Sequence, residues 1–150
     1  MARALGLPFI DTDRVIVAEH GPIAQIFEHS GEAHFRALEA DAVSYALTRR
    51  AVVALGGGAV MTSSVAEALA GHPVVLLTIT PEAAARRLDP VTRPLVRDGI
   101  GAWSALVESR MPTYSELARA TWDTSTRPID RIANEVAQWA REHSAEQGER

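Results

Sequence analysis

The sequence predicts an α/β fold with a mainly parallel sheet, and three observations support this. Short apolar, β-branched runs lack polar alternation, which is typical of strands that are covered on both faces. Segments with helical spacing of apolar residues lie between these runs, as in βαβ units. The length of 150 residues is that of one domain with its own core, so residues 1–150 are expected to form a single domain.

Four segments are expected to be strands. Residues 51–55 form an apolar run that ends at three Gly residues, and residues 73–80 form a β-branched run that ends at Pro81. Residues 8–11 and 120–123 are weaker candidates.

Helices are expected in the segments between and after the strands. Apolar spacing, capping Ser residues and Pro at a first turn predict them. The expected helices are residues 32–49, 63–69, 81–88 and a segment after Asp130. Residues 89–101 combine Pro, Gly and charged residues and are expected to form a mobile lid, and the polar tail 144–150 is expected to fray.

The composition narrows the classes of partner and site. The chain has no Cys, so it has no disulfide and no thiolate metal site, which fits a cytoplasmic protein. The net charge of −4 disfavours a nucleic-acid partner, and no apolar run is long enough for a membrane span. All 15 basic residues are Arg, so no Lys is available for catalysis.

Two carboxylates, Asp11 and Asp13, follow the first strand candidate directly. At the carboxyl end of a parallel strand such a pair can hold a hydroxyl, orient a nucleophile or reach Mg²⁺ through water. The alternative is a helix N-cap followed by a first-turn acid. Local reasoning leaves both open.

Arg36 and Glu39 are three residues apart on a predicted helix and can pair. A guanidinium fork held by a carboxylate suits the binding of a substrate carboxylate. An ordinary surface ion pair is the alternative, and without context it is favoured.

Three consecutive glycines, Gly56 to Gly58, end a strand and favour close approach of the backbone to a ligand over a simple turn. In the expected lid, Arg93 can close over phosphate. Pro112 suggests the start of a helix, and Arg110 lies just before it. Arg110 can either contact an anion or lie on the surface, and local reasoning leaves both open.

In order and spacing, these segments resemble the shikimate kinase family over about residues 4–139. The segments that carry the resemblance are residues 5–13, 31–39, 54–59, 93–95 and 110–114. The resemblance implies a nucleoside-monophosphate-kinase-like P-loop fold with three α/β/α layers. It also implies transfer of the γ-phosphoryl of ATP to the 3-hydroxyl of shikimate by a cytoplasmic, monomeric enzyme that uses ATP and Mg²⁺.

The resemblance also assigns roles on the substrate side. Asp13 would hold the substrate hydroxyls and orient or deprotonate the nucleophile. Arg36 and Arg110 would bind the shikimate carboxylate, and Glu39 would hold Arg36. Gly57 and Gly58 would offer their backbone N–H groups to the substrate.

On the nucleotide side, the resemblance places Asp11 near Mg²⁺ through water and Arg93 between phosphate and substrate, as a catalytic group. Arg87 and Arg127 would lie against adenine.

The sequence departs from the family pattern at its start. The family opens with a strand, the phosphate-binding loop G-x-x-x-x-G-K-[ST] and a helix, whereas these 150 residues contain no such loop. We therefore expect a truncated member, inactive as given. The alternatives are a non-catalytic shikimate-binding remnant or regulatory module, and a related sugar kinase such as gluconokinase.

Overall fold

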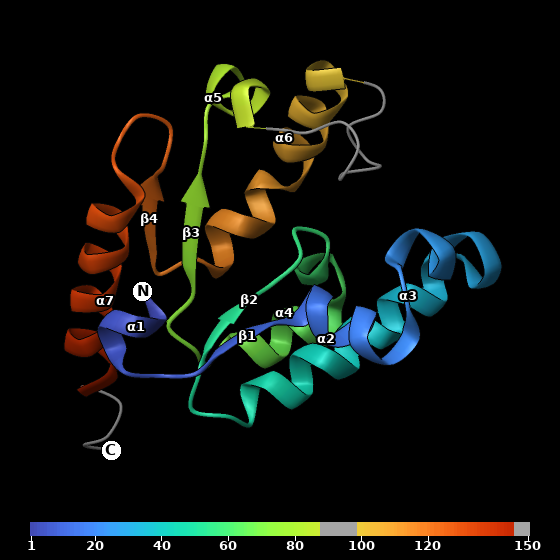
Figure 1. Cartoon of the computed structure of the whole chain (residues 1–150), viewed down its shortest axis with the longest axis horizontal. Helices are drawn as coiled ribbons and strands as arrows, with labels where there is room; N and C mark the ends of the chain where they lie inside the picture. Colours follow the sequence, from blue (N-terminus) through green and yellow to red (C-terminus); the bar gives the residue numbers. More distant parts are fainter. Residues whose placement is uncertain (88–98, 146–150) are drawn as a thin grey trace. The chain divides into compact units, whose positions relative to one another are not determined.

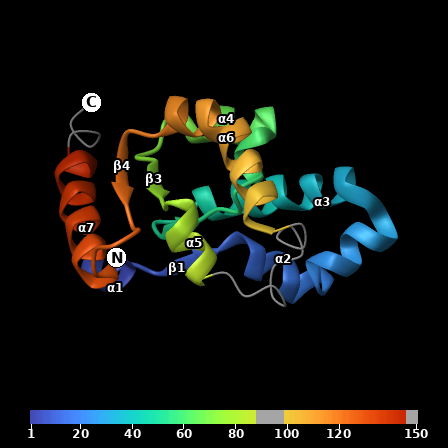
Figure 2. The same ribbon diagram turned by 90° about the horizontal axis from the view of Figure 1, so that it is seen from above.

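The computed structural model describes residues 1–87 and 99–145 (Figure 1). The chain divides into two compact units, Met1–Gly71 and His72–Arg150. Figure 2 gives a second view of the elements in each unit. Each unit is described by itself.

The first unit contains one pair of short parallel strands together with helices. Its elements are α1 (Ala2–Leu5), β1 (Phe9–Asp11), α2 (Thr12–His20), α3 (Ile23–Leu47), β2 (Val52–Ala54), the 3₁₀ turn η1 (Ala59–Met61) and α4 (Ser63–Leu69). In the parallel register Phe9 lies opposite Val52, and Asp11 lies opposite Ala54. The carboxyl ends of both strands therefore lie at the same edge.

A hydrophobic core joins α2 to α3. Its buried members are Ile16, Ile26, Phe35 and Ala42, and partly buried apolar side chains of both helices pack around them. Helix α3 is interrupted at Gly31, whose backbone (φ 80°, ψ 172°) is not helical. This left-handed φ suits a residue without Cβ, and it explains why the sequence pattern predicts a helix from residue 32.

The second unit also contains one parallel strand pair. Its elements are β3 (Val75–Thr78), α5 (Pro81–Arg87), α6 (Gly99–Leu117), β4 (Ala120–Asp123) and α7 (Ile129–Ala145). Val75 lies opposite Ala120 in the parallel register. Helix α7 buries Ile132, Val136 and Ala137.

The α/β class and the parallel strands are confirmed, and all four predicted strands form. Among the described residues the strands make two two-stranded sheets. The expected helices also form. Helix α7 reaches Ala145, so residues 144 and 145, which were expected to belong to the frayed tail, are helical, and residues 146–150 lie outside the described residues. The single domain stays a prediction, because the two units are described separately.

Two expectations around α6 need correction. Residues 99–101, assigned to the lid, begin α6, and residues 89–98 lie outside the described residues. Pro112 lies inside α6 and does not start a helix, so Arg110 is a mid-helix residue. The prediction was wrong because the preference of Pro for the first turn of a helix is only statistical. Inside a helix Pro removes one backbone hydrogen bond and its ring crowds the carbonyl four residues earlier, and α6 contains Pro112 despite this cost.

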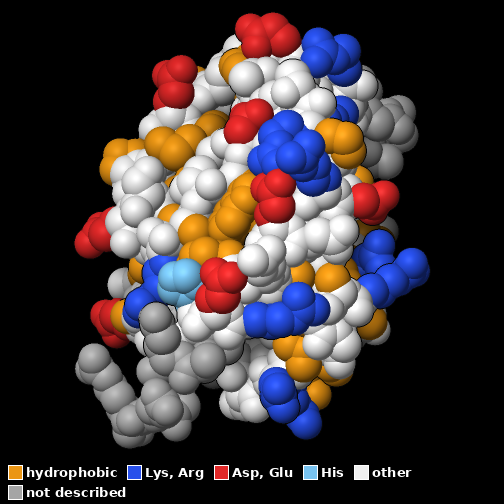
Figure 3. Space-filling model, turned by 90° about the vertical axis from the view of Figure 1, so that its left-hand side faces the viewer, with side chains coloured by type: hydrophobic (Ala, Val, Ile, Leu, Met, Phe, Trp, Pro, Cys, Tyr) orange, Lys and Arg blue, Asp and Glu red, His pale blue; other side chains and the backbone are white. Residues whose placement is uncertain are grey.

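The surface seen from the side of α7 carries interspersed acidic and basic side chains with apolar side chains between them (Figure 3). This mixed face agrees with the modest net charge of −4. Among the described residues, no helix has both the length and the apolar character that a membrane crossing requires.

Candidate active site

The candidate site lies in the first unit, where β1 and β2 end together. β1 leads directly into α2, and β2 leads into the glycine turn of residues 56–58. The fully buried Thr12 ties the two strand ends, because its Oγ1 donates to the carbonyl oxygen of Ala54 at 3.2 Å. Ligands of parallel sheets gather at this edge.

Arg36 is held by two carboxylates of its own helix. Its Nη1 donates to Glu39 Oε2 at 2.6 Å. Its Nε and Nη2 donate to Glu32 Oε1 at 3.4 and 3.2 Å. The side chain of Glu39 is only 2% exposed, whereas that of Glu32 is 66% exposed. The buried Glu39 thus anchors the guanidinium, and the pair is more than a surface ion pair.

The environment of Arg36 keeps it charged. Burial opposes the charge, but hydrogen bonds and negative charge from Glu39 and Glu32 together raise the pKa of Arg36 above its ordinary value. The Arg36 side chain is still 22% exposed. A permanently charged, partly accessible fork is suited to binding a carboxylate.

The glycine turn fits closely against these side chains. A Cβ built on Gly58 would lie 2.6 Å from Nη2 and 2.7 Å from Cζ of Arg36. A Cβ on Gly56 would lie 2.9 Å from Glu39 Oε1 and 3.0 Å from Asp13 Oδ1. The turn therefore brings Asp13, Glu39 and Arg36 together at the strand ends.

The structure places the predicted substrate-side residues of the first unit at one site. These are Asp13, Arg36, Glu39, Gly57 and Gly58, of which Gly58 is buried and Gly57 is exposed. Sequence reasoning missed Glu32 and the tight contacts of Gly56. The spacing Glu32–Arg36, one helical turn, is the signal that could have revealed Glu32.

Asp11 serves as the N-cap of α2. Its Oδ1 accepts hydrogen bonds from the backbone N–H groups of Asp13 (3.1 Å) and Arg14 (3.2 Å). The capping alternative is therefore present in the structure. The cap uses only Oδ1. The second oxygen, Oδ2, lies 3.7 Å from Arg14 Nε.

Replacing Asp11 with Ala is expected to lower the free energy of unfolding by about 1 kcal/mol, because the first turn of α2 loses its cap. Urea unfolding followed by circular dichroism measures this. Asp41→Ala, an exposed change within α3, is the control and is expected to stay within about 0.5 kcal/mol of the parent chain. Equal stability of the Asp11 variant would contradict the capping role.

The two arginines that were expected near adenine both make contacts within the second unit. Arg87 Nη2 donates to the carbonyl oxygens of Thr124 (2.9 Å) and Ser125 (3.3 Å), which joins α5 to the segment after β4. Arg127 pairs with Glu135, and its hydrogen bond holds the pKa of Glu135 below its ordinary value. Both arginines therefore have structural contacts, and their nucleotide role stays a prediction.

Of the two other predicted site arginines, the structure describes only Arg110. Arg110 is half-buried in α6, in the second unit. Arg93 lies outside the described residues, so its expected place between phosphate and substrate stays a prediction.

The described residues contain no cluster of three or more His, Asp or Glu side chains that could hold a metal ion. Mg²⁺ commonly keeps several waters and takes one or two carboxylates together with substrate phosphates. The expected contact of Asp11 with Mg²⁺ through water needs no such cluster and stays a prediction.

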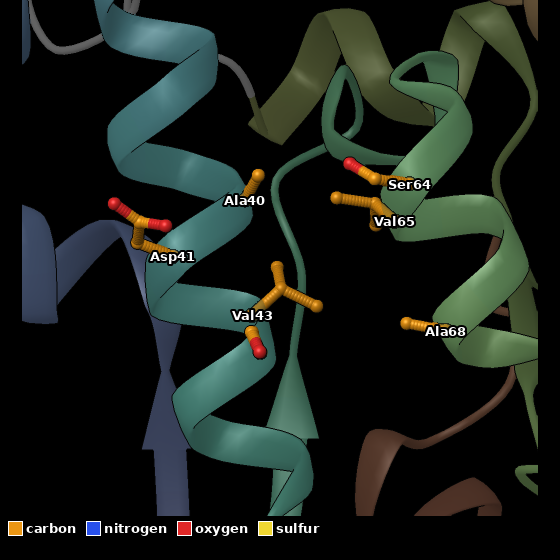
Figure 4. Close-up of a pocket in the computed structure, with 7 residues that line it drawn as sticks. Ala40, Asp41, Val43, Ser64, Val65 and Ala68 are labelled. Carbon is orange, nitrogen blue, oxygen red and sulfur yellow. The ribbon is translucent and has the colours of Figure 1, made fainter.

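A pocket of about 240 Å³ lies between α3 and α4 (Figure 4). Small side chains line it: Ala40, Asp41, Val43, Ser44, Ser64, Val65 and Ala68. None of the predicted substrate residues is among them. We therefore assign the candidate site to the strand ends, where the charged groups converge, and not to this pocket.

Comparison with known proteins identifies the family. The family model described as shikimate kinase matches residues 1–141. The chain belongs to the shikimate kinase family. Members of this family are phosphotransferases, so the enzyme class expected from the sequence is confirmed, and the match favours shikimate kinase over gluconokinase.

Curated relatives and solved structures agree with this assignment. The shikimate kinase of Salinispora tropica is 45% identical over 141 residues, which cover 91% of this chain and 84% of that protein. The Mycobacterium avium enzyme is 44% identical over 132 residues, which cover 85% and 75%. The structure of the Acinetobacter baumannii shikimate kinase matches with a TM-score of 0.78 at 28% identity, covering 99% of this chain and 87% of that one. The P-loop kinase type of α/β fold is thereby confirmed.

Proposed function

We propose that this chain binds shikimate at the strand ends of its first unit, as the phosphoryl acceptor of a shikimate kinase. The observation that carries the proposal is the Arg36 guanidinium, held by the buried Glu39 and seated against Gly58. The related Acinetobacter baumannii structure is a complex with shikimate. Family membership supports the same ligand here.

In the proposed complex, the shikimate carboxylate pairs with Arg36. Arg110 is a further proposed carboxylate-binding residue on the strength of family membership alone. The ring hydroxyls face Asp13, and the N–H groups of Gly57 and Gly58 lie beneath the ring. Asp13 would accept a hydrogen bond from the 3-hydroxyl and take its proton as the oxygen attacks phosphorus. Glu39 contributes by keeping Arg36 in place.

ATP and Mg²⁺ are the proposed cosubstrate and metal, on the strength of family membership. ATP would supply the γ-phosphoryl group, and Mg²⁺ would neutralise phosphate charge. Asp11 would contact the metal through water, and Arg87, Arg93 and Arg127 are the proposed nucleotide-side residues. The 150 residues contain neither Lys nor a G-x-x-x-x-G-K-[ST] segment, so we assign no phosphate-cradling step to them. A cytoplasmic monomer is part of the same proposal.

Isothermal titration of the chain with three ligands tests the acceptor site. Shikimate is expected to bind, and its methyl ester to bind at least about tenfold more weakly, because a charge-assisted bidentate pair is lost. Gluconate is expected not to bind. Preference for gluconate, or no binding of shikimate, would contradict the proposal.

Turnover is a separate prediction. Because these 150 residues lack the Lys that contacts phosphates in P-loop kinases, the 150-residue polypeptide is expected to bind shikimate without phosphorylating it. A coupled assay that follows ADP formation measures this. Near-normal turnover by the polypeptide would show that other residues hold the phosphates.

A further inference from the structure

The contacts of Arg36 point to a role for Glu32 that the substrate model does not include. A guanidinium offers parallel N–H donors along its edges, and each edge can take a carboxylate with both oxygens. Glu39 occupies Nη1. The edge formed by Nε and Nη2 points away from that contact and is held by one oxygen of Glu32, at 3.4 and 3.2 Å.

Glu32 and Glu39 differ in how firmly each is held. Glu39 is buried, and its second oxygen lies close to Gly56, so its position is fixed by packing. Glu32 is mostly exposed and directly follows Gly31, where α3 is interrupted. An exposed glutamate can rotate into water at little cost, because exposed ion pairs are held only weakly.

The charge balance at the site also disfavours an anionic ligand while Glu32 is present. Asp13 and Glu39 both lie close to Gly56, and Glu32 adds a further carboxylate next to the guanidinium of Arg36. An incoming carboxylate would meet repulsion from Glu32 as well as competition for the same donors.

We propose that Glu32 occupies the place of the substrate carboxylate in the ligand-free chain and must leave the Nε–Nη2 edge of Arg36 before that carboxylate can bind. Glu32 is thus an internal competitor that lowers affinity for anionic ligands. The inference rests on the proposed function, since it takes shikimate to be the anion that displaces Glu32.

The test is titration of shikimate into Glu32→Gln, which keeps the shape of the side chain and removes its charge. Affinity is expected to rise about two- to fivefold, the range that a surface ion pair allows. Glu32→Ala is expected to change affinity in the same direction. Glu28→Gln removes the same charge from an exposed position of α3 before the Gly31 break and is expected to leave affinity unchanged.

The methyl ester of shikimate separates displacement from general charge effects. Because the ester cannot form the bidentate pair, its affinity is expected to be the same in the parent chain and in Glu32→Gln. Unchanged or weaker shikimate binding by Glu32→Gln would overturn the inference and leave the proposed function intact. Equal tightening by Glu28→Gln, or equal tightening for the ester, would also overturn it. Failure of the parent chain to bind shikimate would overturn the proposed function itself, and this inference with it.

Discussion

Replacing Arg36 with Ala is expected to weaken shikimate binding by about 30-fold or more, because the ligand carboxylate loses its charged partner at a partly buried site. Isothermal titration of parent and variant measures the change. Arg49→Ala, which removes an exposed arginine just beyond the end of α3, is the matched control and is expected to bind normally.

The same substitution leaves the buried Glu39 without its guanidinium, so a loss of about 1–3 kcal/mol in the free energy of unfolding is also expected. Binding is therefore compared at a temperature where circular dichroism shows the variant folded. Arg36→Lys provides a second variant, since it keeps a positive charge opposite Glu39 but lacks the fork. We expect Arg36→Lys to fold more stably than Arg36→Ala and still to bind weakly. Parent-like affinity in both variants would show that Arg36 does not hold the carboxylate.

Replacing Gly58 with Ala is expected to lower shikimate affinity by about tenfold while leaving the fold in place. The new Cβ would lie 2.6 Å from Arg36 Nη2, so the guanidinium has to move. The backbone itself tolerates Ala, because Gly58 has φ −87° and ψ −16°, in the ordinary helical region. The loss would therefore come from the position of Arg36 and not from strain in the turn.

Gly71→Ala is the matched control for the Gly58 variant. A Cβ on Gly71 would have no heavy atom within 4 Å, so its affinity for shikimate and its urea midpoint are expected to stay close to those of the parent chain. If Gly58→Ala binds as tightly as the control, the glycine turn does not position Arg36.

The fold was largely predictable because its signals are local. The apolar runs at residues 51–55 and 73–80 contain strands, and the helix start at residue 32 coincides with the break at Gly31. Pro112 was misjudged because the preference of Pro for a first turn is statistical, and a long helix such as α6 can enclose it.

Several residues that the structure brings together at the candidate site were predictable from the sequence, but Glu32 and the contacts between the residues were not. Order and spacing identified Asp13, Arg36 and Glu39, since the family resemblance depends on them. For Asp11, capping and metal binding both use carboxylate oxygens, so only the hydrogen bonds to Asp13 and Arg14 reveal the cap. The closeness of Gly56 to Asp13 and Glu39 joins residues far apart in the sequence, and local patterns carry no information about such packing.

A crystal structure of the chain with shikimate tests the central claim most directly. The account predicts the ligand carboxylate within hydrogen-bond distance of Arg36 Nε and Nη2, Glu32 turned away, and ring hydroxyls facing Asp13 above the glycine turn. Shikimate bound elsewhere, with Arg36 still held by both Glu32 and Glu39, would contradict it.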